Sequence, residues 1–385
     1  MVTSEIEWSS RSEFAVPEDV AYFNTANLAP LLHTVRAAGE AALASRGMPW
    51  TISPADWFTD VERLRTQVGA LLGDDADGVA LVPSTSYGMA TAADNLPLVP
   101  GSAIVVLAEE YPSGVYTWRR HAERRGATVV TVTPEPGQDW TSSILSTMDL
   151  LGERVGIVSV PQVHWTDGSW VDLDTVGTRA RELGAALVID ASQSLGAVPM
   201  DVRALRPDFV VSVGYKWLLG PFGRGYLWVA PTHRDGTPLE ENWIVRAGSE
   251  DFARLVDYRD AYQPGARRFD QGQRTAFELT PMAVAATAQL LAWGVPRVAA
   301  HLARITGIVL DRATALGLEA PRRPRGPHML GLPLPAGSGD RVTAALAERG
   351  CYAAVRGNSL RIAPHLHITE HDIDTLTDAL GTALG

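Results

Sequence analysis

One lysine, in a chain that otherwise avoids lysine, is the first residue whose type and position could do chemistry. Lys216 is the single lysine among the 33 basic residues of this 385-residue sequence. It lies in the apolar stretch YKWLLGPFG at 215–223, one residue after the predicted strand FVVSV at 209–213. Burial disfavours the charged form of an amine, so we expect a lowered pKa and a usable nucleophile. A surface lysine is the less favoured interpretation, because the stretch offers little polar surface.

An aspartate ends the predicted strand that comes before the one leading to Lys216. Asp190 closes the apolar run AALVID at 185–190. A carboxylate at the end of a buried strand needs a cation or hydrogen-bond donors, and alone it would as readily be a cap for the next turn. A lysine that can form a Schiff base and an aspartate that can protonate a pyridine nitrogen are the protein half of pyridoxal phosphate chemistry. The pair therefore predicts that cofactor.

A third strand end could hold a phosphate. The residues after the strand GVALVP at 78–83 are rich in hydroxyls and begin a helix: Ser84, Thr85, Ser86, Tyr87 and Gly88. Amides and hydroxyls at a helix N-terminus bind anions. On its own this is a common capping sequence. Together with Lys216 and Asp190 at other strand ends, it predicts a phosphate site.

Two more strand ends carry aromatic and polar side chains. Tyr111 follows the strand AIVVLA at 103–108 closely and could stack on a pyridine ring. His164 and Trp165 follow the strand RVGIVSV at 154–160, where they could contact the cofactor or the substrate. A buried structural role is an equally good interpretation of His164.

The elements that must position these residues alternate between strands and helices from about residue 60 to 230. Continuous apolar runs indicate a sheet buried on both faces, and therefore mostly parallel strands covered by helices. In open sheets of this kind, ligands bind outside the carboxyl ends of the strands. We expect an α/β domain with seven strands, at 78–83, 103–108, 127–132, 154–160, 185–190, 209–213 and 225–230.

The rest of the chain predicts a smaller α/β domain. The sequence becomes polar and rich in turns at 231–275, and a long helical segment follows from 281 to about 316, interrupted near Gly294–Pro296. We expect an N-terminal segment at 1–20 that packs near the small domain, a large cofactor-binding domain at 21–270 and a small C-terminal domain at 271–385.

Composition excludes several classes of function. A formal net charge of −11 argues against nucleic-acid binding, which needs a basic face. No apolar run approaches the ~18–20 residues of a membrane span, and the first residues lack the pattern of a signal peptide. The one cysteine, Cys351, leaves no internal disulfide. We therefore expect a cytoplasmic protein without nucleic-acid or membrane partners.

At this point the sequence resembles the class V, fold-type I pyridoxal-phosphate enzymes. That group includes cysteine desulfurases, kynureninases, isopenicillin N epimerase-like proteins and C–S lyases. The resemblance runs from YFNTANLAP at 22–30 to LRIAPHLHIT at 360–369, and it is most specific in VIDASQSLGAVPMDV and DFVVSVGYKWLLGPFGRGYLWV. It implies a large and a small domain, pyridoxal 5'-phosphate as cofactor, an amino-acid substrate, and a homodimer with active sites at the interface.

The resemblance also assigns roles to particular residues. Lys216 matches the Schiff-base lysine, Asp190 the partner of the pyridine nitrogen, and Gln193 the partner of the phenolic oxygen. Tyr215 takes the place of a phosphate-binding histidine found in many members, and its phenol can still donate a hydrogen bond. The remaining matches are Thr85 and Ser86 in the phosphate loop, Tyr111 as the stacking ring, Gln273 from the partner subunit in place of a threonine, and Arg361 for the substrate α-carboxylate.

Other residues are candidates for the substrate cleft. They are aromatic or polar: Tyr22, Asn24, Asn27, His164, Trp165, Trp243 and Arg356. A metal site at His365, His367 and His371 is disfavoured, because PHLHITEH indicates the start of the last helix. We expect no metal.

The resemblance leaves the reaction open. Cys351 lies too close to Arg361 for the mobile loop that a cysteine desulfurase needs, so we expect a small buried hydrophobe. Kynureninase is disfavoured because QGQRT lacks that group's Asn-Pro-Pro pattern. We expect β-elimination on a cysteine-derived or bulky amino acid, with Lys216 as general base. Transamination, decarboxylation-coupled deamination or epimerisation in secondary metabolism are the enzymatic alternatives, and a cofactor-binding protein without turnover is the non-enzymatic one.

Overall fold

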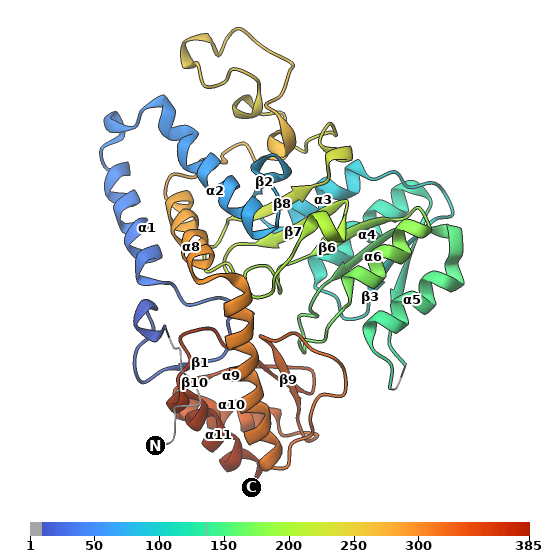
Figure 1. Ribbon diagram of the computed structural model, residues 1–385, viewed down its shortest axis with the longest axis vertical. Helices are drawn as coiled ribbons and strands as arrows, with labels where there is room; N and C mark the ends of the chain where they lie inside the picture. The colour runs from blue at the N-terminus through green and yellow to red at the C-terminus, as the bar shows by residue number, and fades with distance from the viewer. Residues whose placement is uncertain (1–9, 136) are drawn as a thin grey trace.

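The computed structural model describes residues 10–135 and 137–385, and its centre is a seven-stranded sheet (Figure 1). The strand order is β2-β8-β7-β6-β5-β3-β4. Six of these strands run in the same direction, and β8 runs in the opposite direction. The expected strands are all present to within one residue: β2 (Val79–Val82), β3 (Ala103–Leu107), β4 (Thr128–Val132), β5 (Val155–Pro161), β6 (Ala186–Asp190), β7 (Phe209–Val213) and β8 (Gly225–Val229). The prediction of a mostly parallel seven-stranded sheet is confirmed.

Helices cover both faces of this sheet, as the continuous apolar runs require. Successive residues of a strand point to opposite faces, so Val79 and Leu81 join one buried cluster and Ala80 and Val82 join another. The first cluster lies under α2 (Thr59–Leu71), α5 (Trp140–Leu151), α6 (Leu173–Glu182) and α8 (Leu279–Trp293). The second lies under α3 (Thr85–Asn95) and α4 (Pro112–Arg125).

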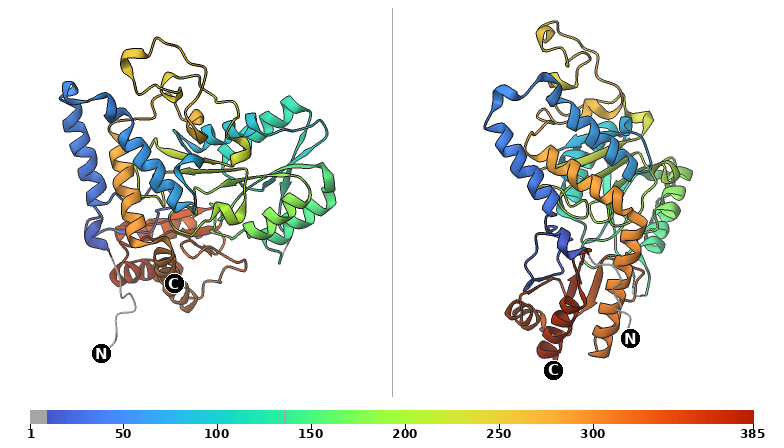
Figure 2. Two further views of the ribbon diagram at one scale, coloured as in Figure 1. Left: turned by 45° about the horizontal axis from the view of Figure 1, so that its top comes forward. Right: turned by 60° about the vertical axis from the view of Figure 1, so that its left-hand side comes forward.

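Two long helices connect the large domain to the small one. α8 packs beside α1 (His33–Arg46) and α2, and α9 (Val295–Ala315) runs down to the small domain (Figures 1 and 2). The predicted interruption is present, since Gly294 adopts a φ of 78° and Pro296 lies in the first turn of the next helix. None of the helices in the described ranges is both long and apolar enough to cross a membrane.

The small domain contains a three-stranded antiparallel sheet in the order β11-β12-β9. Its elements are β9 (Leu330–Pro333), α10 (Gly339–Glu348), β10 (Cys351–Tyr352), β11 (Ala354–Arg356), β12 (Ser359–Ile362) and α11 (Glu370–Leu384). The short strand β1 (Ala21–Tyr22), which falls in the range expected for the large domain, pairs with β10 instead. The described part of the chain therefore begins against the small domain and then crosses to the large one.

The described part of the N-terminal segment lies against the small domain (Figure 2). The Ser10 amide donates to the Leu366 carbonyl (2.9 Å), and Arg11 forms an ion pair with Asp372 of α11 (2.8 Å). Residues 1–9 of the predicted segment lie outside the described residues.

Candidate active site

A narrow cavity opens at the carboxyl ends of β2, β3, β5, β6 and β7, where the strand-end residues converge. About 370 Å³ of space, part of it open to solvent, lies between its walls. The predicted residues that line it are Thr85, Tyr111, Trp165, Asp190, Gln193, Tyr215 and Lys216. Glu110, Pro161, Val163, Ser192 and Val213 complete the wall. The topology thus brings these seven predicted residues to one place.

Lys216 is buried at the base of this cavity, with 8% of its surface exposed. Burial lowers the pKa of its amine to about 8; the charge of Asp190 opposes that shift, and the charge of Arg361 adds to it. The Nζ atom lies 5.4 Å from the centre of the Tyr111 ring. The lysine is therefore close to an aromatic wall, and its amine loses its proton at a lower pH than that of an ordinary lysine.

Asp190 ends β6 and is held by the turn that follows. Its Oδ1 accepts the Ser192 amide at 2.9 Å. Burial raises the pKa of this carboxyl, whereas the Ser192 hydrogen bonds and the charge of Lys216 lower it. Ser192 also links the site to α3, because its Oγ lies 3.2 Å from Oγ1 of Thr85.

Gln193 is fixed on several sides by residues that sequence reasoning missed. Its Nε2 donates to the Ala26 carbonyl (3.0 Å), and its Oε1 accepts from Nε1 of Trp217 (2.8 Å). His328 Nε2 lies 2.5 Å from the Gln193 carbonyl oxygen, and the His328 ring packs edge-on against Trp217. The carboxamide is therefore held rigidly at the cavity wall.

The helix expected to bind a phosphate begins at the cavity. Ser84 is the N-cap of α3, and its Oγ accepts the Tyr87 amide at 3.3 Å. A side chain at Gly88 would place its Cβ 2.6 Å from Val211 of β7, so only glycine allows the helix to lie this close to the sheet. Ser86 is exposed, and the ring of Tyr87 packs against the core under α3 and α4 rather than lining the cavity.

Glu110 is a cavity residue that sequence reasoning did not select. Its Oε1 accepts the Tyr111 amide (2.7 Å), and burial together with the charge of Asp190 raises the pKa of its carboxyl to about 8. The sequence could have identified Glu110 as a site residue from its position between Glu109 and Tyr111, at the end of β3. Glu109 itself adopts a φ of 54°, an uncommon conformation that turns the chain at this strand end.

His164 has contacts that favour the structural interpretation over a cofactor contact. Its Nε2 lies 3.1 Å from the Ala108 carbonyl and its Nδ1 2.7 Å from Oγ1 of Thr166. The ring stacks on Trp140, and burial lowers its pKa. Both nitrogens thus have protein partners, and the side chain ties its turn to the end of β3.

Arg361 lies beside the cavity with 1% of its surface exposed. It donates to the Trp165 carbonyl (2.7 Å) and to Oδ1 of Asn24 (3.2 Å), while its Nε has no partner among the described residues. Burial and the nearby charge of Arg356 lower its pKa to about 10. The guanidinium therefore retains capacity for a further acceptor.

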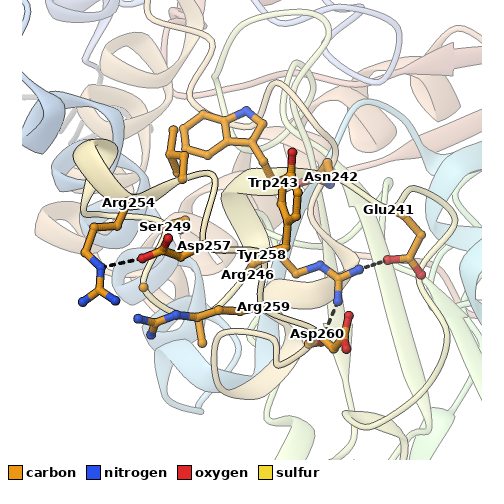
Figure 3. Close-up of a pocket in the computed structure, with 13 residues that line it drawn as sticks. Glu241, Asn242, Trp243, Arg246, Ser249, Arg254, Asp257, Tyr258, Arg259 and Asp260 are labelled. Carbon is orange, nitrogen blue, oxygen red and sulfur yellow. Dashed lines mark hydrogen bonds and ion pairs between the residues drawn. The ribbon is translucent and has the colours of Figure 1, made fainter.

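Three other candidates lie away from the cavity. Asn27 and Gln273 are exposed and do not line it. Trp243 lies instead in a pocket formed by the projecting loop at 241–260, together with Arg246 and Tyr258 (Figure 3). The described chain therefore does not bring these residues to Lys216.

Cys351 and two of the histidines are buried structural residues. The Cys351 thiol has its pKa raised to about 12 by burial. The imidazole of His367 lies 2.8 Å from the Tyr22 carbonyl, and His365 packs against Phe14 and Trp217. The thiol is therefore protonated at neutral pH and poorly suited to act as a nucleophile.

Comparison with protein families matches residues 53–359 to the family described as Aminotransferase class-V. The uncharacterized aminotransferase YcbU of Bacillus subtilis is 26% identical over 331 residues, covering 84% of this chain and 85% of the relative. The isopenicillin N epimerase of Streptomyces clavuligerus is 26% identical over 344 residues, covering 83% and 84%. A kynureninase of Deinococcus radiodurans is 28% identical over 283 residues, covering 71% and 66%.

Solved structures share the fold at lower identity. The cystine C–S lyase C-DES in complex with its product cysteine persulfide has a TM-score of 0.83 at 18% identity, covering 94% of this chain and 98% of that one. The cysteine desulfurase CsdA from Escherichia coli has a TM-score of 0.81 at 19% identity, covering 97% of each chain. The expected fold-type I architecture is confirmed.

Proposed function

This chain belongs to the class V aminotransferase family of pyridoxal-phosphate-dependent enzymes, and on that basis we propose that it catalyses β-elimination on a cysteine-derived or bulky amino acid. The observation that supports chemistry at Cα is the buried Lys216 beside Asp190, with its pKa lowered to about 8, a pair that β-elimination shares with the alternatives below. Transamination, decarboxylation-coupled deamination or epimerisation on the same site are the alternatives.

The cavity residues fit the cofactor chemically. Lys216 offers an amine for covalent attachment, Asp190 a carboxylate for the pyridine nitrogen, and Tyr111 an aromatic face. The N-terminus of α3, with Thr85, offers amides and a hydroxyl for the phosphate, and Tyr215 offers a phenol. When bound, pyridoxal phosphate supplies a ring that withdraws electrons from Cα of the amino acid.

The chain's own residues then orient the substrate and move protons. Arg361 binds the α-carboxylate through its guanidinium and so fixes Cα near Lys216. The Lys216 amine takes the Cα proton at Nζ, a role that suits a base with a pKa near 8. Asp190 keeps a proton on the pyridine nitrogen. The apolar wall of Val163 and Val213 excludes water from the reacting atoms.

A product assay tests the reaction. The holoenzyme, supplied with an S-substituted cysteine and no amino acceptor, is expected to release a thiol, pyruvate and ammonia in equal amounts, with one water consumed. A requirement for an α-keto acid, or release of carbon dioxide, would contradict elimination and support an alternative. Lys216→Arg keeps the positive charge but should lower pyruvate release by at least about a thousandfold, because arginine stays protonated.

The buried position of the Cys351 thiol leads to a second expectation, that this thiol takes no part in the reaction. Cys351→Ala should retain most of the pyruvate-forming activity, because its thiol stays protonated and lies away from Lys216. If Cys351→Ala stopped releasing sulfur from the substrate while its thermal stability stayed that of the wild type, the result would instead support a mechanism in which Cys351 forms a persulfide.

We also infer a homodimer in which Gln273 reaches the partner's phosphate site, in a cytoplasmic enzyme of secondary metabolism. The support is the exposed position of Gln273, outside its own chain's cavity. Light scattering is expected to give twice the mass of 41.4 kDa, and a monomer that retains activity would contradict the arrangement.

A further inference from the structure

A second, larger cleft opens beside the cavity, between the large domain and the hairpin of β11 and β12. It holds about 1820 Å³ of space open to solvent. Glu110 and Trp165 line the cavity, whereas their neighbours Glu109 and Thr166 line the cleft. A hydrogen bond from Trp165 Nε1 to the Glu109 carbonyl (2.7 Å) joins the two turns. These two turns therefore form a wall common to the cavity and the cleft.

The register of the hairpin places two arginines on one face. Arg361 pairs with Ala354, and Arg356 pairs with Ser359. Residues two apart in a strand share a face, so Arg356 and Arg361 are diagonal neighbours, at positions separated by about 7–8 Å. Arg361 donates to the Trp165 carbonyl beside the cavity, while Arg356 lines the cleft.

The charge of Arg356 has no counter-charge in the described chain. Its Nη1 donates to the carbonyl of Val355 (3.0 Å), and within residues 10–135 and 137–385 it forms no ion pair with a carboxylate. Its charge also acts on the buried Arg361 and lowers the pKa of that group. Two neighbouring cations without an acid favour a ligand with two anionic groups.

The acidic residues of the cleft do not supply this counter-charge. Asp139 caps α5, Asp167 accepts hydrogen bonds from the loop that follows it, and Glu319 forms an ion pair on the surface. Glu109 forms no ion pair within the described residues, and it is exposed. It is the group that would favour a cationic substrate instead.

We propose that the substrate is an α-amino acid whose short side chain ends in an acidic group, with Arg361 binding the α-carboxylate and Arg356 binding the second acid. The inference rests on the proposed function, because it requires an amino acid in the cavity. It narrows the substrate class from amino acids in general to those with two acidic groups.

Pairs of ligands that differ in charge test this assignment. For turnover, the holoenzyme is given S-carboxymethylcysteine, its neutral amide S-carbamoylmethylcysteine and the cationic S-(2-aminoethyl)cysteine. For binding, glutamate and glutamine are titrated while the visible absorbance of the bound cofactor is followed. We expect the acids to be favoured over the amides by at least about tenfold, in kcat/KM and in Kd, as for a hydrogen bond between charged groups.

Variants assign that preference to one side chain. Arg356→Gln should remove the preference by weakening only the acids, and Arg356→Lys should restore part of it. Arg322→Gln is the matched control, because Arg322 lines the same cleft but is exposed and paired with Glu319 at 3.2 Å. It should keep the wild-type preference.

Equal affinity for acid and amide, or an equal loss of both in Arg356→Gln, would overturn the proposal. A preference for the cationic ligand would also overturn it and would assign recognition to Glu109. The two proposals can fail separately. If no cysteine derivative yields pyruvate, the proposed elimination is wrong. If glutamate nevertheless binds better than glutamine, and Arg356→Gln removes that difference, the proposed substrate class is still supported.

Discussion

At the scale of single residues, removal from water acts in opposite directions on the groups around the cavity. It lowers the pKa of Lys216 to about 8 and raises that of Glu110 to about 8, while the pKa of Asp190 is raised as well. Arginine can replace lysine where only a positive charge is needed, but it does not lose its proton. The proposed attachment of the cofactor at Lys216 therefore accounts for the one lysine that this chain rich in arginine retains.

The lowered pKa of Lys216 predicts how the apoenzyme takes up its cofactor with pH. Only the unprotonated amine attacks the aldehyde of pyridoxal phosphate, so the uptake rate should rise about tenfold per pH unit up to about 8 and then level off. Stopped-flow absorbance from pH 6 to 10 measures this rate. A rate that keeps rising toward 10.5, the value of an ordinary lysine, would contradict the burial argument.

At the scale of elements, the strands and their ends were predictable because continuous apolar runs need cover on both faces. The break between α8 and α9 was predictable from Gly294 and Pro296. The partners of Gln193 were not, because Ala26 and His328 lie 167 and 135 residues away in the chain. Local patterns place a residue on an element, but they do not specify which distant element packs against it.

Because α3 packs closely on β7, adding one methyl group at Gly88 is predicted to lower the stability of the protein. Gly88→Ala places a Cβ 2.6 Å from Val211, so α3 must shift and the protein should lose about 1–3 kcal/mol of stability. The cofactor should also dissociate faster, because Thr85 moves with the helix. Gly114→Ala in α4 is the control, since its Cβ would meet nothing closer than 3.7 Å. Urea denaturation and cofactor release measure both effects, and equal stability of the two variants would contradict the packing argument.

At the scale of the whole molecule, buried histidines hold the small domain to the rest of the chain. His328 contacts the Gln193 loop of the large domain, and His367 contacts Tyr22 of β1, before the chain crosses to the large domain. Burial lowers the pKa of each to about 4, and it lowers the pKa of His365 between them. Between about pH 4 and 6.5, His328 and His367 therefore stay mostly neutral in the folded protein, whereas the same side chains bind protons in the unfolded chain.

These histidines predict acid sensitivity. Their folded pKa values lie below the unfolded value of 6.5, so stability is complete above pH 6.5 and falls as the pH drops toward 4. Each contributes at most about 1.4 kcal/mol per pH unit. Urea denaturation at pH 7.5 and 5 should show a smaller loss for His365→Phe than for the wild type, while exposed His371→Gln should match the wild type. Identical losses in all three proteins would contradict this account.

The attachment site of the cofactor tests the central claim most directly. The holoenzyme is reduced with borohydride and digested with trypsin, and the cofactor-bearing peptide is identified by mass spectrometry. Because Lys216 is the only lysine, the account predicts one labelled peptide that contains it, and no label in Lys216→Arg. Label at the N-terminal amine alone, or a holoenzyme in which no peptide carries the cofactor, would contradict it.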